Sequence, residues 1–286
     1  MSADSITPFG FENLPVRGAL IHLSRTWRRM LRDHDYDTVI AETLGHAAAA
    51  TALIAQSLKF DGTITLQIQG SGILRMLVMQ CTGDLDLRGM ASAAPGKVAA
   101  DFGGLIEKGR CAVTVDAGER PYQGIVNIDD TSLAACLEHY FARSVQVPCH
   151  LALVASESVA GGVLLQQVPG QSIDEDDWNR LSFLAKTLGC ADFEGDAGTE
   201  LIGKLFAEDD VRVYKPRAVN FRCRCSRQKT EDVLKMLGEK EARGTLAERG
   251  GVEVVCEYCG RKWNFDAVDV ERLFVDNVVQ GPDSVQ

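Results

Sequence analysis

Four cysteines toward the end of the sequence have the residue type and spacing of a metal site. One residue separates Cys223 from Cys225, and two separate Cys256 from Cys259. Four thiolate sulfurs are the ligand set that structural zinc prefers, at Zn–S distances of about 2.3 Å. An extended segment can turn residues i and i+2 to one side, and a tight turn ending at Gly260, which tolerates left-handed backbone, can aim the second pair at the same point. We therefore predict one zinc ion bound by all four thiols in the reduced protein.

The same thiols have features of a redox switch. Each pair is close enough in sequence to form its own disulfide. Two residues of extended chain span about 7 Å, at the limit for a disulfide, so joining the first pair requires the backbone to bend and excludes the metal-bound geometry. A purely structural zinc knuckle is the alternative. Cations around the pairs should lower the thiol pKa values and favour oxidation; they are Arg222, Arg224, Arg227, Arg261 and Lys262.

The other cysteines show no such spacing. An odd total of nine cysteines in 286 residues argues against a secreted disulfide framework and for thiols that stay reduced. Each of the other five lies among apolar neighbours, where a thiol usually behaves as a small hydrophobe, and we assign them no function. They are Cys81, Cys111, Cys136, Cys149 and Cys190.

The sequence offers little support for an enzyme. Residues 198–205, "GTELIGKL", nearly match a phosphate-binding loop, but Leu205 replaces the metal-binding Ser or Thr and the segment has helical character. The five histidines show no metal or nucleophile spacing. A thiol oxidoreductase using Cys256-x-x-Cys259 is an alternative, but the expected βαβ context is absent. We therefore expect no enzymatic activity.

Charge and hydropathy restrict the partners and the compartment. The net charge is −10, yet residues 217–265 carry 11 Lys and Arg against 7 Asp and Glu, a local +4 that leaves −14 elsewhere. This basic segment permits a zinc-ribbon nucleic-acid-binding protein as the rival function, although the surrounding acidity and the lack of a recognition-helix pattern make nucleic acid an unlikely partner. No signal-peptide pattern is seen, and no apolar stretch approaches the roughly 18 residues of a membrane span. We expect a cytoplasmic protein with no membrane contact.

The elements that must position these thiols indicate an α+β protein. Residues 1–168 are predicted to form an N-terminal mixed α/β sheet domain. Helical composition marks residues 26–34, 39–60 and 131–144, and period-two patterns predict three strand pairs. These pairs are 62–70 with 73–81 around the turn Gly70-Ser71-Gly72, 111–115 with 122–128, and 150–156 with 161–168.

A helical connector, residues 169–219, and a small zinc domain, residues 220–286, follow. Ser172 and Glu175 have capping-box spacing and predict a helix that continues through Leu188. We expect two or three short helices in the connector, with a break at residues 193–198, and one or two helices and a strand between the cysteine pairs. Isolated helices this short depend on tertiary contacts, so the order of the connector should depend on its neighbours.

With these residues described, the sequence resembles the redox-regulated heat-shock holdase family, the 33 kDa chaperonins, over nearly its whole length. The family signature is C-x-C, about thirty residues and C-x-x-C, and here the gap is residues 226–255. Supporting stretches include "VRGALIHLS" near the start, "PYQGIVNIDDTSLAACLEHYFARS" and "AGGVLLQ". The α+β architecture and its division into three parts are consistent with this resemblance.

The resemblance implies a function and a mechanism. It implies that Cys223, Cys225, Cys256 and Cys259 bind zinc in the reduced, inactive form and pair as 223–225 and 256–259 on oxidation. Strong oxidants would release the zinc, unfold the connector and expose surface that holds unfolding client proteins without ATP. We also expect a homodimer in the oxidised state. Client identity and the client-binding surface do not follow from the sequence.

Overall fold

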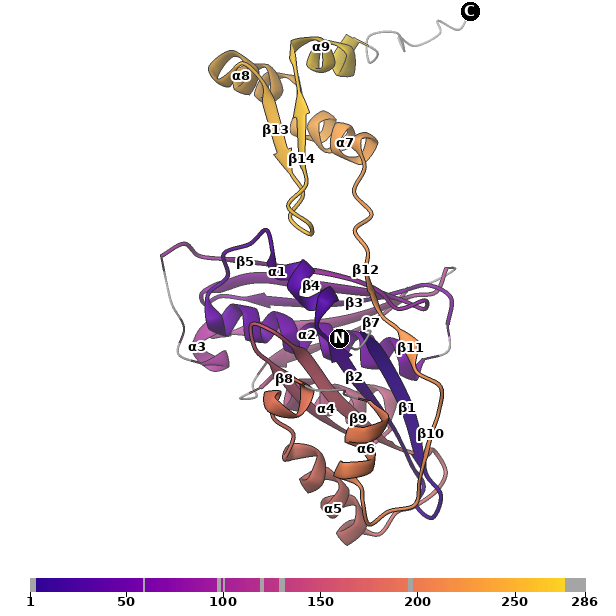
Figure 1. Cartoon of the computed structure of the whole chain (residues 1–286). Coiled ribbons are helices and arrows are strands. Elements are labelled where there is room, and N and C mark those ends of the chain that lie inside the picture. The colour runs from indigo at the N-terminus through magenta and orange to yellow at the C-terminus, as the bar shows by residue number, and fades with distance from the viewer. Residues whose placement is uncertain are drawn as a thin grey trace, which may run out of the picture. The chain divides into compact units, whose positions relative to one another are not determined.

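The computed structural model describes residues 4–58, 60–96, 99, 101–118, 121–128, 132–194 and 198–275. The chain divides into two compact units, residues 1–222 and 223–286, which we treat separately (Figure 1). The connector expected over residues 169–219 packs within the first unit. The cysteine cluster lies in the second unit.

An antiparallel sheet forms one layer of the first unit. Its strand order is β10 (Val211–Val213), β1 (Ser5–Phe11), β2 (Val16–Leu23), β9 (Ala160–Gln167) and β8 (Cys149–Ala155), and β11 (Arg217–Ala218) also pairs with β1. The predicted pairing of 150–156 with 161–168 is confirmed as β8–β9. The end of the connector supplies β10 and β11, so this segment completes the sheet of the N-terminal part.

A second sheet forms another layer of the same unit. Its order is β12 (Asn220–Phe221), β5 (Asp86–Ala93), β4 (Leu74–Thr82), β3 (Thr63–Gly70), β6 (Gly109–Asp116) and β7 (Tyr122–Ile128), with only the β12–β5 pairing parallel. The β3–β4 and β6–β7 pairs confirm the two remaining predicted hairpins. The period-two apolar residues of β3, namely Ile64, Leu66 and Ile68, are completely buried.

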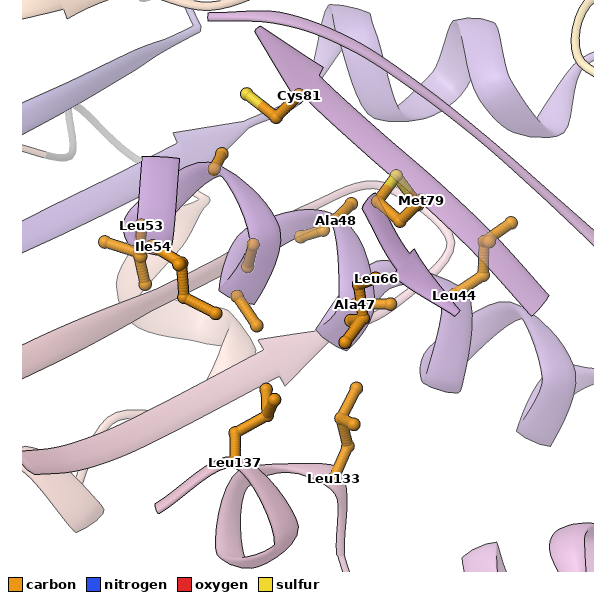
Figure 2. Close-up of a cluster of buried hydrophobic side chains, with 14 of the residues drawn as sticks. Leu44, Ala47, Ala48, Leu53, Ile54, Leu66, Met79, Cys81, Leu133 and Leu137 are labelled. Atoms are coloured by element: carbon orange, nitrogen blue, oxygen red, sulfur yellow. The ribbon is translucent and has the colours of Figure 1, made fainter. Parts of the chain in front are cut away.

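Helix α2 (Thr38–Ser57) packs between the two sheets, against β2, β8 and β9 on one side and β3, β4 and β5 on the other (Figure 1). Its small residues, alanines and Gly45, allow this close approach. A Cβ atom added at Gly45 would lie only 2.6 Å from the Cβ of Ala155, so the two elements could not pack this closely with a larger residue there. Figure 2 shows Leu44 and Leu53 of α2 in a cluster that includes Leu66 and, from α4 (Leu133–Tyr140), Leu137.

Helix α2 also corrects one sequence expectation. With 20 residues and a mean hydropathy of 1.3, it is long and apolar enough to cross a membrane, so the expectation that no stretch approaches this length was wrong. Burial of 72% of its apolar window within the fold explains the composition, because a helix covered by two sheets is apolar on every side.

The predicted N-terminal helices correspond to α1 (Arg25–Leu31), α2 and α4; residues 59 and 131 of the predicted ranges lie outside the described residues. A π-helical turn, Phe141–Val145, continues α4. The short helix α3 (Phe102–Ile106) was not predicted.

The connector helices cover the other face of the first sheet. They are α5 (Glu175–Lys186), a 3-10 turn (Cys190–Phe193) and α6 (Thr199–Leu205). Their buried side chains, among them Leu181, Phe193 and Ile202, pack against Leu20 and Val163 of the sheet in a core separate from that around α2. Two or three short helices were expected, and the structure confirms them; of the expected break at 193–198, residues 195–197 lie outside the described residues.

The predicted capping box is wrong. Asp174, not Ser172, precedes α5, and its Oδ1 accepts a hydrogen bond of 2.9 Å from the backbone N–H of Asp176. Asp174 is an equally good N-cap two residues closer to the helix, so the Ser172 hydroxyl is not needed. The helix ends at Lys186, which leaves Leu188 outside it although Leu188 remains buried.

The second unit is small. It contains α7 (Arg227–Leu237), α8 (Glu239–Arg249), the antiparallel pair β13 (Val252–Val255) and β14 (Lys262–Phe265), and α9 (Ala267–Val275). The predicted helices and strand between the cysteine pairs are confirmed. Its described core consists of Leu234, Ala242, Val252, Phe265, Val270, Leu273 and Phe274.

Candidate metal centre

Two separate chain segments supply the four thiols. Cys223 and Cys225 lie in the irregular segment that leads to α7, which begins after the N-cap Ser226. Cys256 and Cys259 lie in the turn between β13 and β14. In that turn the Cys256 carbonyl accepts hydrogen bonds from the backbone N–H of Cys259, at 3.2 Å, and of Gly260, at 2.8 Å. The φ angle of Gly260 is +66°, which confirms the predicted left-handed backbone.

The structure brings all four sulfurs to one point. They lie within 4.8 Å of one another, with 3.7 Å between the Sγ atoms of Cys223 and Cys256 and 3.6 Å between those of Cys225 and Cys259. All four cysteines are free thiols. A tetrahedral ion with bonds of about 2.3 Å to sulfur separates its ligands by about 3.8 Å, which is close to these distances. The cluster therefore has the ligand type and the spacing to hold a metal ion.

The surrounding cations do not act on the thiols as the sequence suggested. Arg227 forms an ion pair with Asp269 at 2.7 Å, and Lys262 forms one with Glu253 at 3.1 Å. Arg261 stacks over the Trp263 ring, 5.5 Å from its centroid. Cations that are paired with carboxylates or stacked on a ring stabilise a nearby thiolate less than free ones.

The thiol pKa values follow burial more than the cations. Burial is the largest cause that raises the pKa of Cys225, of Cys256 and of Cys259 above the ordinary value. Burial acts in the same direction on Cys223, but hydrogen bonds, first that from the Cys225 backbone N–H, lower the pKa of Cys223 overall. The expectation that the cations lower the pKa of all four thiols is therefore wrong for three of them.

The remaining cysteines lie in the first unit and apart from this cluster. Cys81, Cys111 and Cys136 are buried, and Cys149 and Cys190 are half-buried. Burial, together with the nearby carboxylates of Asp86 and Glu138, raises the pKa of Cys81 and of Cys149 to about 12. Thiols with such pKa values react slowly with oxidants.

The other chemistry considered from the sequence has no matching geometry in the described residues. Residues 199–205 of the phosphate-loop-like segment form helix α6, so their backbone N–H groups point along a helix and cannot wrap a phosphate. Cys256 and Cys259 lie in a turn between two strands, not at the start of a helix as in a thiol oxidoreductase. In the basic segment, Arg243 pairs with Glu239 and Glu271, which further reduces the charge available to a nucleic acid.

Comparisons with known proteins agree with the fold. The family model described as "Hsp33 protein" matches residues 4–266. A 33 kDa chaperonin of Nitrosococcus oceani is 41% identical over 280 residues, 96% of each chain, and one of Methylobacillus flagellatus is 36% identical over 289 residues, 99% of each chain. The crystal structure of a 33 kDa chaperonin from Thermotoga maritima superposes with a TM-score of 0.80 at 25% identity and covers 96% of this chain and 99% of that one. The chain therefore belongs to the Hsp33 family.

Proposed function

We propose that this protein is an ATP-independent holdase chaperone that oxidation of its cysteine cluster activates. The observation that carries the proposal is the convergence of four free thiols, from two segments about thirty residues apart, within 4.8 Å. The names of the relatives support the chaperone function. The cluster supports its regulation.

In the reduced state, Cys223, Cys225, Cys256 and Cys259 would hold one zinc ion. Sulfur ligands and near-tetrahedral spacing favour zinc over hard cations. The bound ion would cross-link the segment before α7 to the β13–β14 turn. Because the described core of this unit is only seven residues, we expect metal binding to supply much of its folding free energy, on the order of 10 kcal/mol in such modules.

Oxidation would remove this ligand set. Each pair of thiolates, together with two protons taken up from solvent, reduces one hydrogen peroxide to two water molecules as one S–S bond forms. We propose the pairs 223–225 and 256–259, because each closes a very short loop. The Sγ atoms of Cys223 and Cys256, and those of Cys225 and Cys259, also lie within 3.7 Å of each other, but all edges of a tetrahedron are alike, so this proximity does not select the product.

Loss of order in the second unit would spread to the connector, residues 169–219. The connector packs on the first sheet through short helices, and its departure would uncover the apolar face that includes Phe9, Leu20 and Val163. This face would then bind unfolded client proteins. In this proposal the oxidised protein acts as a homodimer in the cytoplasm, with no catalytic activity of its own.

Hydrogen exchange and an aggregation assay on the full chain test the proposal. On treatment with peroxide at elevated temperature, we expect zinc release, loss of four thiols, faster exchange in residues 171–194 and 198–216, and suppressed aggregation of a thermally unfolding test protein. The variant Cys149→Ser, outside the cluster, should behave like the wild type. Activity that appears while the connector stays equally protected would contradict the unfolding step, and salt-sensitive binding of RNA or DNA by the reduced protein would favour the nucleic-acid alternative.

A further inference from the structure

A pocket of about 450 Å³ lies in the first unit, at the C-terminal end of α2. Its volume is within the range of small-molecule sites, roughly 300–1,000 Å³. Ala19 and Leu164, which line it, belong to the core around α2, so the pocket lies on the side of the first sheet that faces this helix. Its polar and aromatic lining residues are Arg17, Gln56, Ser57, Gln166 and Tyr214.

The sheet register explains why these side chains meet. Gly10 of β1 is opposite Arg17 of β2, and Arg17 is opposite Gln166 of β9, so the three share one face. Ala19 and Leu164, opposite each other on the same face, form an apolar floor next to this row. The small side chains at Gly10 and Ala19 leave the space open.

Tyr214 closes one side of the pocket. A Cβ atom added at Gly10 would lie 3.8 Å from the Tyr214 hydroxyl oxygen, so the tyrosine ring lies close over this glycine. The backbone N–H of Tyr214 donates a 2.9 Å hydrogen bond to the carbonyl of Pro8, which fixes the tyrosine directly after β10. The wall is therefore aromatic and carries a hydroxyl group.

Gln166 and Arg17 are two polar side chains of the pocket for which the described residues provide no partner. Gln166 is only 4% exposed, and its carboxamide has no hydrogen bond to any described residue. The residue is held in place by its burial in β9, and its amide group lines the pocket and can form hydrogen bonds with a ligand there. Arg17 is exposed at the pocket and forms no ion pair within the described part of the chain. Among the described lining residues Arg17 is the one charged group, and none is a carboxylate.

We propose that this pocket binds a small organic carboxylate with a compact apolar body, either aromatic or short aliphatic. The carboxylate accepts charge-assisted hydrogen bonds from the Arg17 guanidinium and a further bond from the Gln166 amide. The body lies on Ala19 and Leu164 against the Tyr214 ring. Such a ligand satisfies the unpartnered amide and the unpaired cation together, which a neutral or cationic molecule does not.

The position of Tyr214 has a consequence for regulation. Tyr214 belongs to the connector, so the pocket is complete only while β10 is paired with β1. A ligand that binds the complete pocket stabilises the paired state by mass action and should delay activation. This consequence rests on the proposed function, whereas ligand binding itself does not.

Titration of the full-length, reduced, zinc-loaded protein with benzoate tests the site. For a ligand of this size we expect saturable binding with a dissociation constant of about 1–10 mM, measured by calorimetry and by chemical-shift changes at Arg17, Gln56 and Gln166. Benzamide, which has the same shape without the charge, should bind about tenfold or more weakly. Arg17→Gln should reduce benzoate affinity to that of benzamide.

The control is Arg75→Gln, which removes another exposed arginine, on β4 and outside the pocket. It should leave benzoate binding unchanged. An equal loss in this variant would show a general charge effect and overturn the proposal, as would equal affinities for benzoate and benzamide in the wild type or the absence of saturation by benzoate. The comparison of the two ligands needs no variant, and none of these results depends on chaperone activity.

Discussion

Phe193 is the side chain whose removal should release the connector without any oxidation. It is 1% exposed and lies in the core between the connector and the first sheet. A Cβ at Gly161 would come within 2.6 Å of its ring, so the glycine provides the space that the ring fills. The ring is parallel to that of His22, and His22 Nε2 donates a 2.9 Å hydrogen bond to the Phe193 carbonyl. Phe193 therefore attaches the connector to β2 and β9 at once.

The variant Phe193→Ala should weaken the docking of the connector by about 3–5 kcal/mol, the usual cost of truncating a buried phenylalanine. At about 1.4 kcal/mol per factor of ten, this raises the population of the undocked connector by roughly two to four orders of magnitude. We expect hydrogen exchange in α5 and α6 to accelerate accordingly in the reduced, zinc-loaded protein, with the amides of α2 unaffected. Partial suppression of client aggregation without oxidant should accompany it.

Phe183→Ala is a matched control, because Phe183 lies on the same connector in α5 but is 70% exposed. Phe183→Ala should change the rate of hydrogen exchange in α5 and α6 only slightly. If the two variants exchange alike, the connector does not depend on the Phe193 contact. If Phe193→Ala accelerates exchange throughout residues 4–222, the connector is an inseparable part of the first unit and cannot act as a switch.

Three further predictions concern the thiols and one half-buried histidine. Cys256→Ser should sharply weaken metal binding, because three sulfurs would remain, and metal analysis that finds undiminished zinc would exclude Cys256 as a ligand. Peptide mapping after peroxide treatment should recover the 223–225 and 256–259 disulfides, and a predominance of links between the two pairs, such as 223–259 or 225–256, would contradict this prediction. Burial lowers the pKa of His46 to about 4, so the unfolded chain binds its proton first and stability should fall by about 3 kcal/mol as the pH drops from about 6.5 to 4. Denaturant unfolding of His46→Gln should show a smaller fall over this window than the wild type, and identical pH profiles would refute the assignment.

Local patterns predicted the parts of the fold that local physics decides. The hairpins around Gly70 and between β6 and β7 follow from period-two apolar residues joined by short turns, and the Ala-rich composition of α2 identified a helix. The cysteine cluster was predictable because thiol type and spacing alone restrict the possible ligands. These features need no knowledge of distant residues.

The features that the sequence did not predict depend on partners far away in the chain. Val211–Val213 lies in the segment predicted as a helical connector, and it becomes a strand because β1 is available to pair with it. The cations near the thiols were expected to act freely, but Asp269 pairs with Arg227 across 42 residues of sequence. The pocket at Arg17 has no sequence signal, because β1, β2, β9 and the connector each supply only part of it.

The pairing of β1 with β10 also sets the order in which the protein can fold during synthesis. Val211 follows Phe11 by 200 residues, so β1 is made long before the strand that covers its outer edge. At about 5–20 residues per second, a growing chain keeps that edge open for roughly 10–40 s. Open strand edges invite pairing with other chains, and newly made copies should be most prone to aggregate in this interval. The connector, whose release is proposed to activate the protein, is thus also the segment whose synthesis allows the open edge of β1 to be paired. Once it is paired, this edge is no longer available to other chains.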